Sequence, residues 1–269
     1  MRNRRRMKLR IAVVQMMPKF GDVSGNIDKA LSMVRSERAD LYVLPELALS
    51  GYLFESPEEA ASLAQESDEP VFDEFAGLAA TEGVSLVVGF AERDAGTLYN
   101  SSMLLTPEGE RHVYRKVQLF WGEKEIFAPG DRRPGVVESS GARLGMMICF
   151  DWIFPEIART LALAGAQVLC HSTNLVLPYC QDAMITRCIE NRVFAAVSNR
   201  TGTEARAGKE LRFTGLSEIV GVDGKVLLRA GAEEEVVLAA DINPLLADDK
   251  SVTPLNDLMT DRRPELYGL

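Results

Sequence analysis

The sequence alternates short apolar runs with stretches whose apolar residues recur at helical spacing, and this alternation limits the possible folds more than any other feature. The run LRIAVVQM predicts a strand, and Ile27, Leu31 and Val34 then fall on one face of a helix. DLYVLPE predicts a short strand, a helix with Phe75 and Ala79 on one face follows, and VSLVVGF predicts a buried strand. Strands that alternate with helices are typical of α/β proteins.

The same pattern returns in the second half of the chain. LGMMIC, AQVLC and VFAAVSN predict strands, and FPEIARTLALAG and CQDAMITRCIENR predict helices. Two segments place a turn, Pro107-Glu108-Gly109 or Val222-Asp223-Gly224, between strand-like arms and are predicted hairpins. Residues 131–143 predict a loop with a short strand. We therefore expect two related halves in one domain, with two sheets back to back and helices outside.

Length and charge narrow the class of protein further. A chain of 269 residues with 46% hydrophobic and 26% charged residues is an ordinary globular composition for one large α/β domain. The net charge of -9 does not suit a nucleic acid or an anionic membrane, which attract clustered cations. We therefore expect a small-molecule partner, and no nucleic-acid or membrane partner.

The basic cluster MRNRRRMKLR opens the chain, and residues 1–8 are predicted to be a peripheral leader ahead of a single domain over residues 9–269. The apolar core and cleavage site of a secretory signal do not follow it. No stretch approaches the ~20 apolar residues that a membrane span requires. These features predict a cytoplasmic protein. A translation start at Met7, with the leader as a ragged end, is the alternative.

The cysteines and histidines bear on redox state, metals and mechanism. Four cysteines in an acidic chain without a secretory signal are expected to be reduced. They are Cys149, Cys170, Cys180 and Cys188. The two histidines, His112 and His171, lie outside any zinc-binding spacing, so no metal is expected. A Cys-His nucleophilic pair would have to use one of these two.

Three ionisable residues follow strand-like runs, where α/β proteins place ligand chemistry. Cys149 ends GMMIC, Glu46 follows LYVLP, and Lys116 closes HVYRK. A carboxylate could take the thiol proton, and an ammonium would favour the thiolate and offset charge on a tetrahedral intermediate. Taken singly, each residue also fits a structural role: a buried thiol, a surface lysine or a capping glutamate. Spacing and composition alone leave both interpretations open.

Three longer segments resemble the motif regions of the nitrilase superfamily of carbon-nitrogen hydrolases, in the same order. They are VLPELALSGY, YRKVQLFWGEKEIFAPGD and GMMICFDWIFPEIARTLALAGAQVL. Lys116 follows Glu46 by 70 positions and Cys149 follows Lys116 by 33, spacings similar to those of compact members. The resemblance extends to RCIENRVFAAVSNRTG, FTGLSEIVGVDGKVL and DRRPELY, so it covers nearly the whole chain.

The resemblance implies a role for each of these residues. Glu46 is the general base, Lys116 stabilises the oxyanion, and Cys149 is the nucleophile that forms a thioester and releases ammonia or an amine. Glu123 matches the family's second glutamate, near Lys116 and the substrate, although it could instead be a solvated loop carboxylate. No cofactor is implied. Gln118 departs from the histidine that many relatives have there, which puts a pH-dependent supporting role at this position in doubt.

Substrate contacts are expected after the Glu46 strand end, beside the nucleophile and after a further strand end, where aromatic side chains could equally be packing residues. The candidates are Tyr52, Phe150, Trp152 and Asn174. The order Cys149-Phe150-Asp151 resembles amidase-type members, so hydrolysis of a small aliphatic carboxamide is the favoured function. A nitrilase acting on aliphatic nitriles and an N-carbamoyl-amine amidohydrolase are the alternatives, with a catalytically idle binding or assembly protein as the non-enzyme alternative.

The resemblance also implies the architecture and assembly. The fold is expected to be an α-β-β-α sandwich of the four-layer type, which pairs through its helices into an αββα-αββα homodimer or a higher homo-oligomer. The C-terminal segment DLMTDRRPELYGL is expected to pack on the partner copy.

Overall fold

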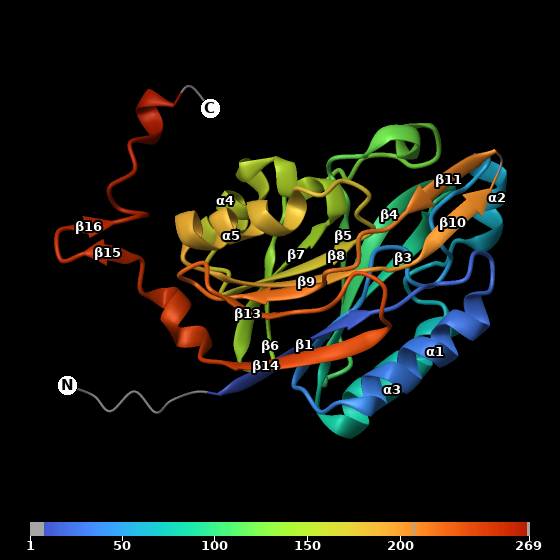
Figure 1. The fold of residues 1–269 in the computed structure, drawn as a ribbon, viewed down its shortest axis with the longest axis horizontal. Helices are drawn as coiled ribbons and strands as arrows, with labels where there is room; N and C mark the ends of the chain where they lie inside the picture. Colours follow the sequence, from blue (N-terminus) through green and yellow to red (C-terminus); the bar gives the residue numbers. More distant parts are fainter. Residues whose placement is uncertain (1–7, 207, 268–269) are drawn as a thin grey trace.

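Two six-stranded sheets pack against each other at the centre of this computed structural model, which describes residues 8–206 and 208–267 (Figure 1). Residues 1–7 of the predicted leader lie outside the described residues, and the single domain over residues 9–269 stays a prediction. The first sheet consists, in spatial order, of β14 (Val236–Ile242), β1 (Leu9–Gln15), β2 (Leu41–Val43), β3 (Ser85–Asp94), β4 (Thr97–Leu105) and β5 (Arg111–Arg115).

The second sheet has the same internal plan. Its strands, in spatial order, are β13 (Val226–Arg229), β12 (Glu218–Val220), β9 (Phe194–Asn199), β8 (Val168–Thr173), β7 (Ala142–Ile148) and β6 (Val136–Ser139). In each sheet three parallel strands are followed by an antiparallel hairpin, β4–β5 or β12–β13. The two predicted hairpins, the short strand in 131–143 and the two related halves are thus confirmed.

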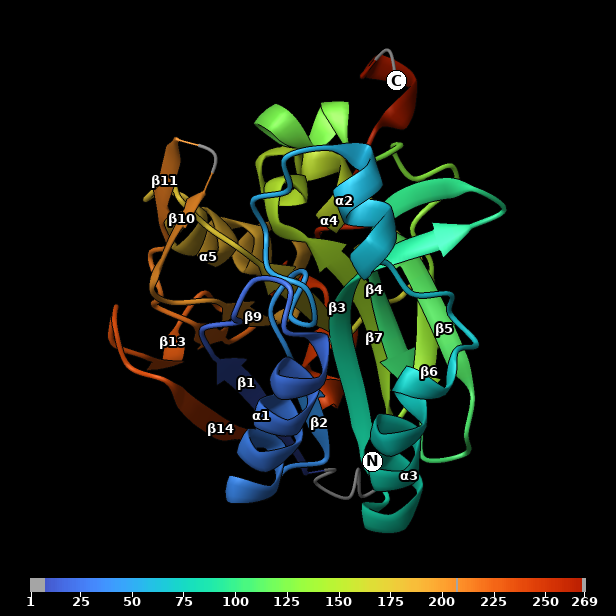
Figure 2. The same ribbon diagram turned by 90° about the vertical axis from the view of Figure 1, so that its right-hand side faces the viewer.

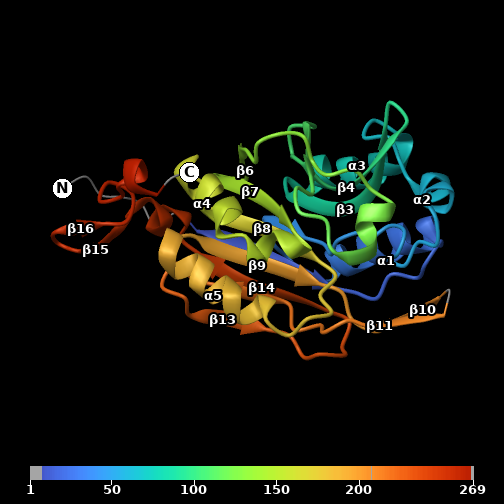
Figure 3. The ribbon, with the colours of Figure 1, turned by 90° about the horizontal axis from the view of Figure 1, so that it is seen from above.

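Helices cover the outer faces of both sheets. They are α1 (Val23–Ser36), α2 (Pro57–Leu63), α3 (Asp73–Glu82), α4 (Pro155–Leu163) and α5 (Cys180–Asn191). Figure 2 shows α1 and α3 side by side against the first sheet, and Figure 3 shows α4 and α5 across the second. The expected α-β-β-α layers are therefore present. None of the described helices is long and apolar enough to cross a membrane.

Strand alternation explains how one sheet serves two apolar layers. In β1, Ile11 and Val13 belong to the core between the sheets, whereas Ala12 and Val14 pack with α1 and α3. Successive side chains of a strand point to opposite faces, so a strand covered on both sides is apolar throughout. This is why LRIAVVQM is a continuous apolar run rather than an alternating one.

Several elements of the fold were not predicted, among them α2, β10 (Thr203–Arg206), β11 (Lys209–Arg212), β14 and the strands after β14. β14 comes from near the end of the chain and pairs with β1, so the last long strand returns to the first sheet and covers what would be its open edge. Beyond β14 the chain forms an extended arm, defined here as residues 244–267, that contains β15 (Ser251–Thr253) and β16 (Asn256–Asp257). The arm runs away from the sandwich, at the opposite end from β10 and β11 (Figures 1 and 3).

Gly89 in β3 allows the segment after β2 to lie directly on the sheet. A β-carbon at this position would be 2.3 Å from the carbonyl oxygen of Pro45 and 2.7 Å from the α-carbon of Glu46. The carbonyl oxygen of Gly89 also accepts a hydrogen bond of 2.9 Å from the backbone N–H of Ala48. The strand and the segment that carries Glu46 are therefore in backbone contact.

We expect Gly89→Ala to lower the free energy of unfolding by at least about 2 kcal/mol, because the added methyl group would meet backbone atoms that cannot rotate away. Denaturant unfolding measures the change. Gly77→Ala in α3 is the matched control: nothing lies within 4 Å of its added β-carbon, and it should stabilise the protein by about 0.5–1 kcal/mol. Equal stability of the two variants would contradict the backbone contact at Gly89.

Candidate active site

Cys149 lies at a sharp turn between β7 and the 3-10 helix η3 (Cys149–Ile153), which leads into α4. Its φ angle is 38°, in the left-handed region that a residue with a β-carbon adopts at a cost of roughly 1–3 kcal/mol. The side chain is 5% exposed. The predicted strand end before a helix is therefore present, in a strained turn that the surrounding contacts must hold.

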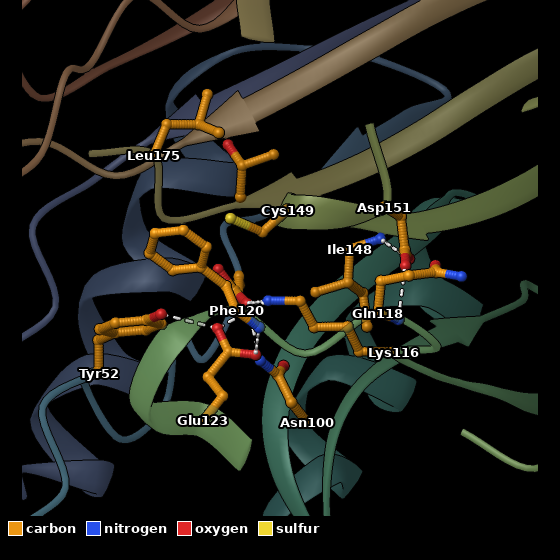
Figure 4. A network of polar contacts seen from close by, with 12 residues as sticks. Tyr52, Asn100, Lys116, Gln118, Phe120, Glu123, Ile148, Cys149, Asp151 and Leu175 are labelled. Carbon is orange, nitrogen blue, oxygen red and sulfur yellow. Dashed lines mark hydrogen bonds and ion pairs between the residues drawn. The ribbon is translucent and has the colours of Figure 1, made fainter. Parts of the chain in front are cut away.

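Lys116 lies between two buried carboxylates. Its Nζ atom is 2.7 Å from Oε1 of Glu123 (Figure 4) and 2.6 Å from Oε1 of Glu46. The three side chains are almost fully buried. The second oxygen of Glu46, Oε2, is also buried and has no hydrogen-bond partner among the described residues. The structure thus brings together the predicted base, lysine and second glutamate, and burial of Glu123 is inconsistent with a solvated loop carboxylate.

Asn100 connects Glu46 to Lys116, although we did not predict it from the sequence. Its side-chain Nδ2 donates to Oε1 of Glu46 at 2.7 Å, and its backbone carbonyl oxygen accepts from the backbone N–H of Lys116 at 2.8 Å. Glu123 is held by the 3-10 helix η2 (Trp121–Glu125), where its Oε2 accepts from the backbone N–H of Phe120 at 3.3 Å. Both carboxylates are therefore fixed before any substrate arrives.

Burial and the neighbouring charges set the protonation states of these groups. Burial alone would lower the pKa of Lys116, but the charges of Glu123 and Glu46 outweigh it and hold that pKa above its ordinary value. Lys116 is therefore an ammonium at neutral pH. Burial raises the pKa of Glu46, against the opposing effect of Lys116, and the charge of Glu123 raises it further.

The resting state of Cys149 is the thiol. Burial raises its pKa well above the ordinary value, and the charge of Glu46 raises it further, whereas Lys116 and the backbone N–H of Asn174 favour the thiolate. The ammonium thus acts in the direction we expected, but burial and Glu46 prevail. A nucleophile in this site must lose its proton as it attacks, so the arrangement suits a base close to the sulfur.

Asp151 clamps the turn at Cys149 to the strand end that carries Lys116. Its Oδ2 accepts from the hydroxyl of Tyr114 at 2.7 Å and from the backbone N–H of Ile148 at 2.9 Å. Its Oδ1 accepts from the backbone N–H of Gln118 at 3.2 Å. We name these four residues the Asp151 clamp. Gln118 takes part through its backbone N–H, and its side chain is not ionisable.

The ionised form of Asp151 is maintained against an electrostatic cost. Burial raises its pKa from 3.8 to about 6, although the hydrogen bonds from Ile148, Tyr114 and Gln118 oppose the shift. Because the pKa of Asp151 is higher in the folded than in the unfolded state, its protonated form favours folding. This contribution to stability is fully present below the unfolded pKa and is lost as pH rises through about 6. The loss is about 3 kcal/mol at neutral pH. The site thus contains a carboxylate that is costly to ionise, as functional sites often do.

The predicted substrate contacts lie in different surroundings. The Tyr52 hydroxyl donates to Oε1 of Glu123 at 2.7 Å, so this side chain belongs to the Lys116 network. Asn174 is 2% exposed, and neither its amide nitrogen nor its amide oxygen has a partner among the described residues. Phe150 packs against Phe120 with ring centroids 5.1 Å apart. Trp152 is buried in the apolar core around α4 and α5.

The two histidines are placed away from a Cys-His arrangement. Nε2 of His171 donates to the backbone carbonyl oxygen of Cys149 at 3.0 Å, and burial lowers its pKa to about 4, so the ring is neutral. His112 contacts the Glu110 side chain at the surface. His171 thus supports the backbone of the turn rather than activating the thiol. Within residues 8–206 and 208–267 no group of three His, Cys, Asp or Glu side chains could hold a metal ion.

A small cavity opens beside the network. Its volume is about 50 Å³, and both Tyr52 and Glu123 line it together with the exposed ring of Trp121. The other lining residues are Leu53, Phe54, Glu55, Gly122, Glu125, Ile126, Phe127 and Lys209. Such a volume suits only a small ligand. Cys149, Lys116 and Glu46 are not among the residues that line this cavity. Their side chains are almost fully buried, and burial strengthens the interactions between their charges.

Comparison with known proteins shows what this chain is similar to. A family model described as carbon-nitrogen hydrolase matches residues 10–249. A nitrilase from Pyrococcus abyssi is 41% identical, over 96% of this chain and 99% of that one, and an (R)-stereoselective amidase from a Pseudomonas species is 34% identical, over 97% and 93%. A mutant amidase from Nesterenkonia sp. AN1, with the acetamide moiety of fluoroacetamide on its active-site cysteine, has a TM-score of 0.79 at 27% identity and covers 97% of this chain and 96% of its own.

We expect Asp151→Asn to slow the reaction of Cys149 with 2-chloroacetamide about tenfold, because an amide places a donor against one of the three donors of the Asp151 clamp. The rate in the parent protein should also fall as pH drops through about 6, where Asp151 takes up a proton. Mass spectrometry of the alkylated protein between about pH 5 and 8 measures both effects. A variant that reacts as fast as the parent would contradict the clamp.

Proposed function

Because the chain belongs to the carbon-nitrogen hydrolase family of the nitrilase superfamily, we propose that it hydrolyses a small aliphatic carboxamide to a carboxylate and ammonia through a thioester on Cys149. The observation that carries the proposal is the buried contact of Lys116 with Glu46 and Glu123, next to a neutral thiol in a strained turn. Such a set supplies a base, a cation for the developing oxyanion and a nucleophile in one site.

The first step is attack by sulfur on the amide carbon. The Cys149 proton moves to Glu46, whose Oε2 is free to accept it, as the carbon–sulfur bond forms and the carbonyl π electrons move to oxygen. The ammonium of Lys116 stabilises the oxyanion, and Glu123 keeps the ammonium charged and oriented. A carboxylate with a raised pKa suits this exchange, since it can accept the proton and later return it.

The remaining steps return the site to its starting state. Protonated Glu46 donates to the leaving nitrogen, the carbon–nitrogen bond breaks, and ammonia leaves a thioester. Glu46 then takes a proton from a water molecule, whose oxygen attacks the thioester carbon. When the carbon–sulfur bond breaks, the proton on Glu46 returns to sulfur and the carboxylic acid leaves. Each step uses the same base, so proton transfers stay within one buried site.

The substrate class rests on the size and polarity of the site. The side chains of Cys149, Lys116 and Glu46 are almost fully buried, which favours a short acyl group over a peptide or a bulky aromatic amide. We propose that Asn174, whose two amide atoms have no partner among the described residues, hydrogen-bonds the substrate amide, and that Tyr52, Phe150 and Trp152 limit its size. Covalent capture of an acetamide moiety by the cysteine of the Nesterenkonia amidase supports a small amide.

Nitrile hydrolysis is the second candidate function, because the chain is 41% identical to the nitrilase from Pyrococcus abyssi. The thiol would add to the nitrile carbon as its proton moves to the nitrile nitrogen, which forms a thioimidate that water converts to the same thioester and ammonia. The two reactions share Glu46, Lys116 and Cys149, so they differ in how the pocket holds a bent amide or a linear nitrile.

Ammonia release from propionamide, propionitrile and N-carbamoylpropylamine distinguishes these candidates. We expect release mainly from propionamide, a loss of at least about 10⁴-fold in Cys149→Ala, and a loss of about 10³-fold in Glu46→Gln, because the first removes the nucleophile and the second the base. Lys116→Met should be as impaired as Glu46→Gln, since it leaves two buried carboxylates without their cation.

Four outcomes would contradict the proposal. Release mainly from propionitrile would identify a nitrilase, and release mainly from the carbamoyl compound would identify a carbamoyl-amine hydrolase. Full activity in Cys149→Ala would exclude the proposed nucleophile. Absence of release from all three compounds, in protein whose circular dichroism spectrum shows it to be folded, would favour the binding or assembly alternative.

We also propose that the enzyme is a homodimer that pairs through α4 and α5 and through the C-terminal arm. Large apolar side chains are exposed on these elements, among them Leu163 at 43%, Ile189 at 51% and Leu255 at 90%. The arm leaves the sandwich (Figure 1), and a segment with such a side chain gains stability by packing on another surface. The α-β-β-α sandwiches of two copies would then form the αββα-αββα stack.

Leu255→Asp tests the contribution of the arm to this dimer. Leu255 contacts solvent over nearly all of its surface in a single chain, so the change should leave the melting temperature of the monomer unchanged. We expect the dimer dissociation constant to rise at least about tenfold, because a charge would be buried at the interface. Sedimentation velocity over a concentration series measures it, and an unchanged constant would show that the arm does not take part.

A further inference from the structure

Arg200 and Glu204 form a buried ion pair that the proposed chemistry does not use. Arg200 follows β9, Glu204 lies in β10, and Nη1 of Arg200 is 2.7 Å from Oε2 of Glu204. Arg200 is 1% exposed and Glu204 is 6% exposed. Removing two charges from water costs several kcal/mol per ion, which an apolar pair of the same size would avoid.

The pair holds the backbone of Tyr52 and Leu53. The carboxylate of Glu204 accepts hydrogen bonds from the backbone N–H groups of both residues. These two groups lie in the segment that follows Glu46, more than 150 positions earlier in the chain. Because a carboxylate with charged and N–H partners makes short, strong hydrogen bonds, the position of this segment is set by Glu204.

Arg200 supports the same segment from the other side. Its guanidinium lies 4.0 Å from the centroid of the Phe213 ring, and the Phe213 ring packs edge-on against the Tyr52 ring at 5.9 Å. Nη2 of Arg200 also donates to the carbonyl oxygen of Pro18 at 3.2 Å. Tyr52 is thus held at its backbone by Glu204 and at its ring by Phe213, and both contacts depend on Arg200.

The position of Tyr52 affects the site through its hydroxyl group. Its hydroxyl donates to Oε1 of Glu123, and the same oxygen contacts Nζ of Lys116 (Figure 4). The contacts therefore run from Arg200 and Glu204 through Tyr52 to Glu123 and the ammonium. A shift of the Tyr52 backbone would remove a donor from Glu123 and leave Lys116 free to turn toward Glu46 alone.

We propose that Arg200 and Glu204 are positioning residues, which act through Tyr52 to keep Glu123 and Lys116 in the geometry that the reaction of Cys149 requires. The inference rests on the proposed function, since it concerns the same site. It assigns a role to a pair that touches neither the substrate nor the reacting atoms. Its measurable consequence is that the effect of Glu204 on Cys149 depends on the Tyr52 hydroxyl.

A double-mutant cycle with Glu204→Gln and Tyr52→Phe tests this dependence. The readout is the rate at which 2-chloroacetamide alkylates Cys149, followed by mass spectrometry with Cys149→Ala as the blank; Cys170, Cys180 and Cys188 are fully buried. We expect each single variant to slow alkylation about tenfold and the double variant to be no slower than either, whereas independent effects would multiply to about a hundredfold. Multiplying effects, or no effect of Glu204→Gln, would overturn the inference.

Glu218→Gln is the matched control. Glu218 is also fully buried and paired with an arginine, Arg229, at 2.7 Å, but its hydrogen bonds do not involve the site. We expect it to lower the melting temperature and leave the alkylation rate within about twofold of the parent. If Glu218→Gln slowed alkylation as much as Glu204→Gln, the effect would reflect general loss of stability and the inference would fail.

A second variant covers the case in which Glu204→Gln does not fold. The paired change Arg200→Met with Glu204→Leu replaces both charged side chains by apolar side chains of similar volume, a replacement that proteins often tolerate. It still lacks the acceptor for Tyr52 and Leu53, so we expect the same tenfold loss in alkylation rate; a rate equal to that of the parent would overturn the inference. Alkylation needs no turnover, so a coupled cycle without ammonia release would contradict the proposed function alone.

Discussion

A lysine ammonium buried between two carboxylates is the interaction on which the rest of this structure depends. Lys116, Glu46 and Glu123 come from separate segments and are removed from water together, a cost that only close contact and further hydrogen bonds can offset. Asn100 and Tyr52 supply those further bonds, one to each carboxylate. The strands that end at this site therefore have to meet within hydrogen-bond distance, and Gly89 has to lack a side chain for the Glu46 segment to reach it.

The charges in the site decide how the proton of Cys149 moves. With both carboxylates ionised the three groups carry a net negative charge, which, with burial, keeps the neighbouring sulfur protonated. In the resting site Cys149 is therefore a thiol and not a thiolate. It becomes a nucleophile only as Glu46 takes its proton. The same buried carboxylate can then return the proton to the leaving nitrogen, so one residue serves as base and acid in turn.

The strained backbone at Cys149 is held in place by side chains that take no part in the proposed reaction. The left-handed turn is fixed by Asp151, which accepts from Ile148, and by His171, whose ring donates to the Cys149 carbonyl. Asp151 also accepts a hydrogen bond from the segment just after Lys116. A single carboxylate therefore connects the turn at Cys149 to the strand end that carries Lys116. A strained conformation persists only where the surroundings over-determine it, and here those surroundings are themselves buried and hydrogen-bonded.

The sequence by itself determined the alternation of strands and helices in the two halves and the hairpins β4–β5 and β12–β13, because apolar periodicity and turn residues are local signals. It also indicated Glu46, Lys116, Glu123 and Cys149 as candidates, through motif order and spacing. Only the tertiary structure decided that β14 returns to β1, and it alone revealed Asn100, the Asp151 clamp and the pair of Arg200 with Glu204. Most of these contacts, such as the hydrogen bonds from the backbone of Tyr52 and Leu53 to Glu204, join segments dozens to hundreds of positions apart, so no local pattern predicts them. The neutral thiol likewise follows from burial and from charges that only the folded chain brings together.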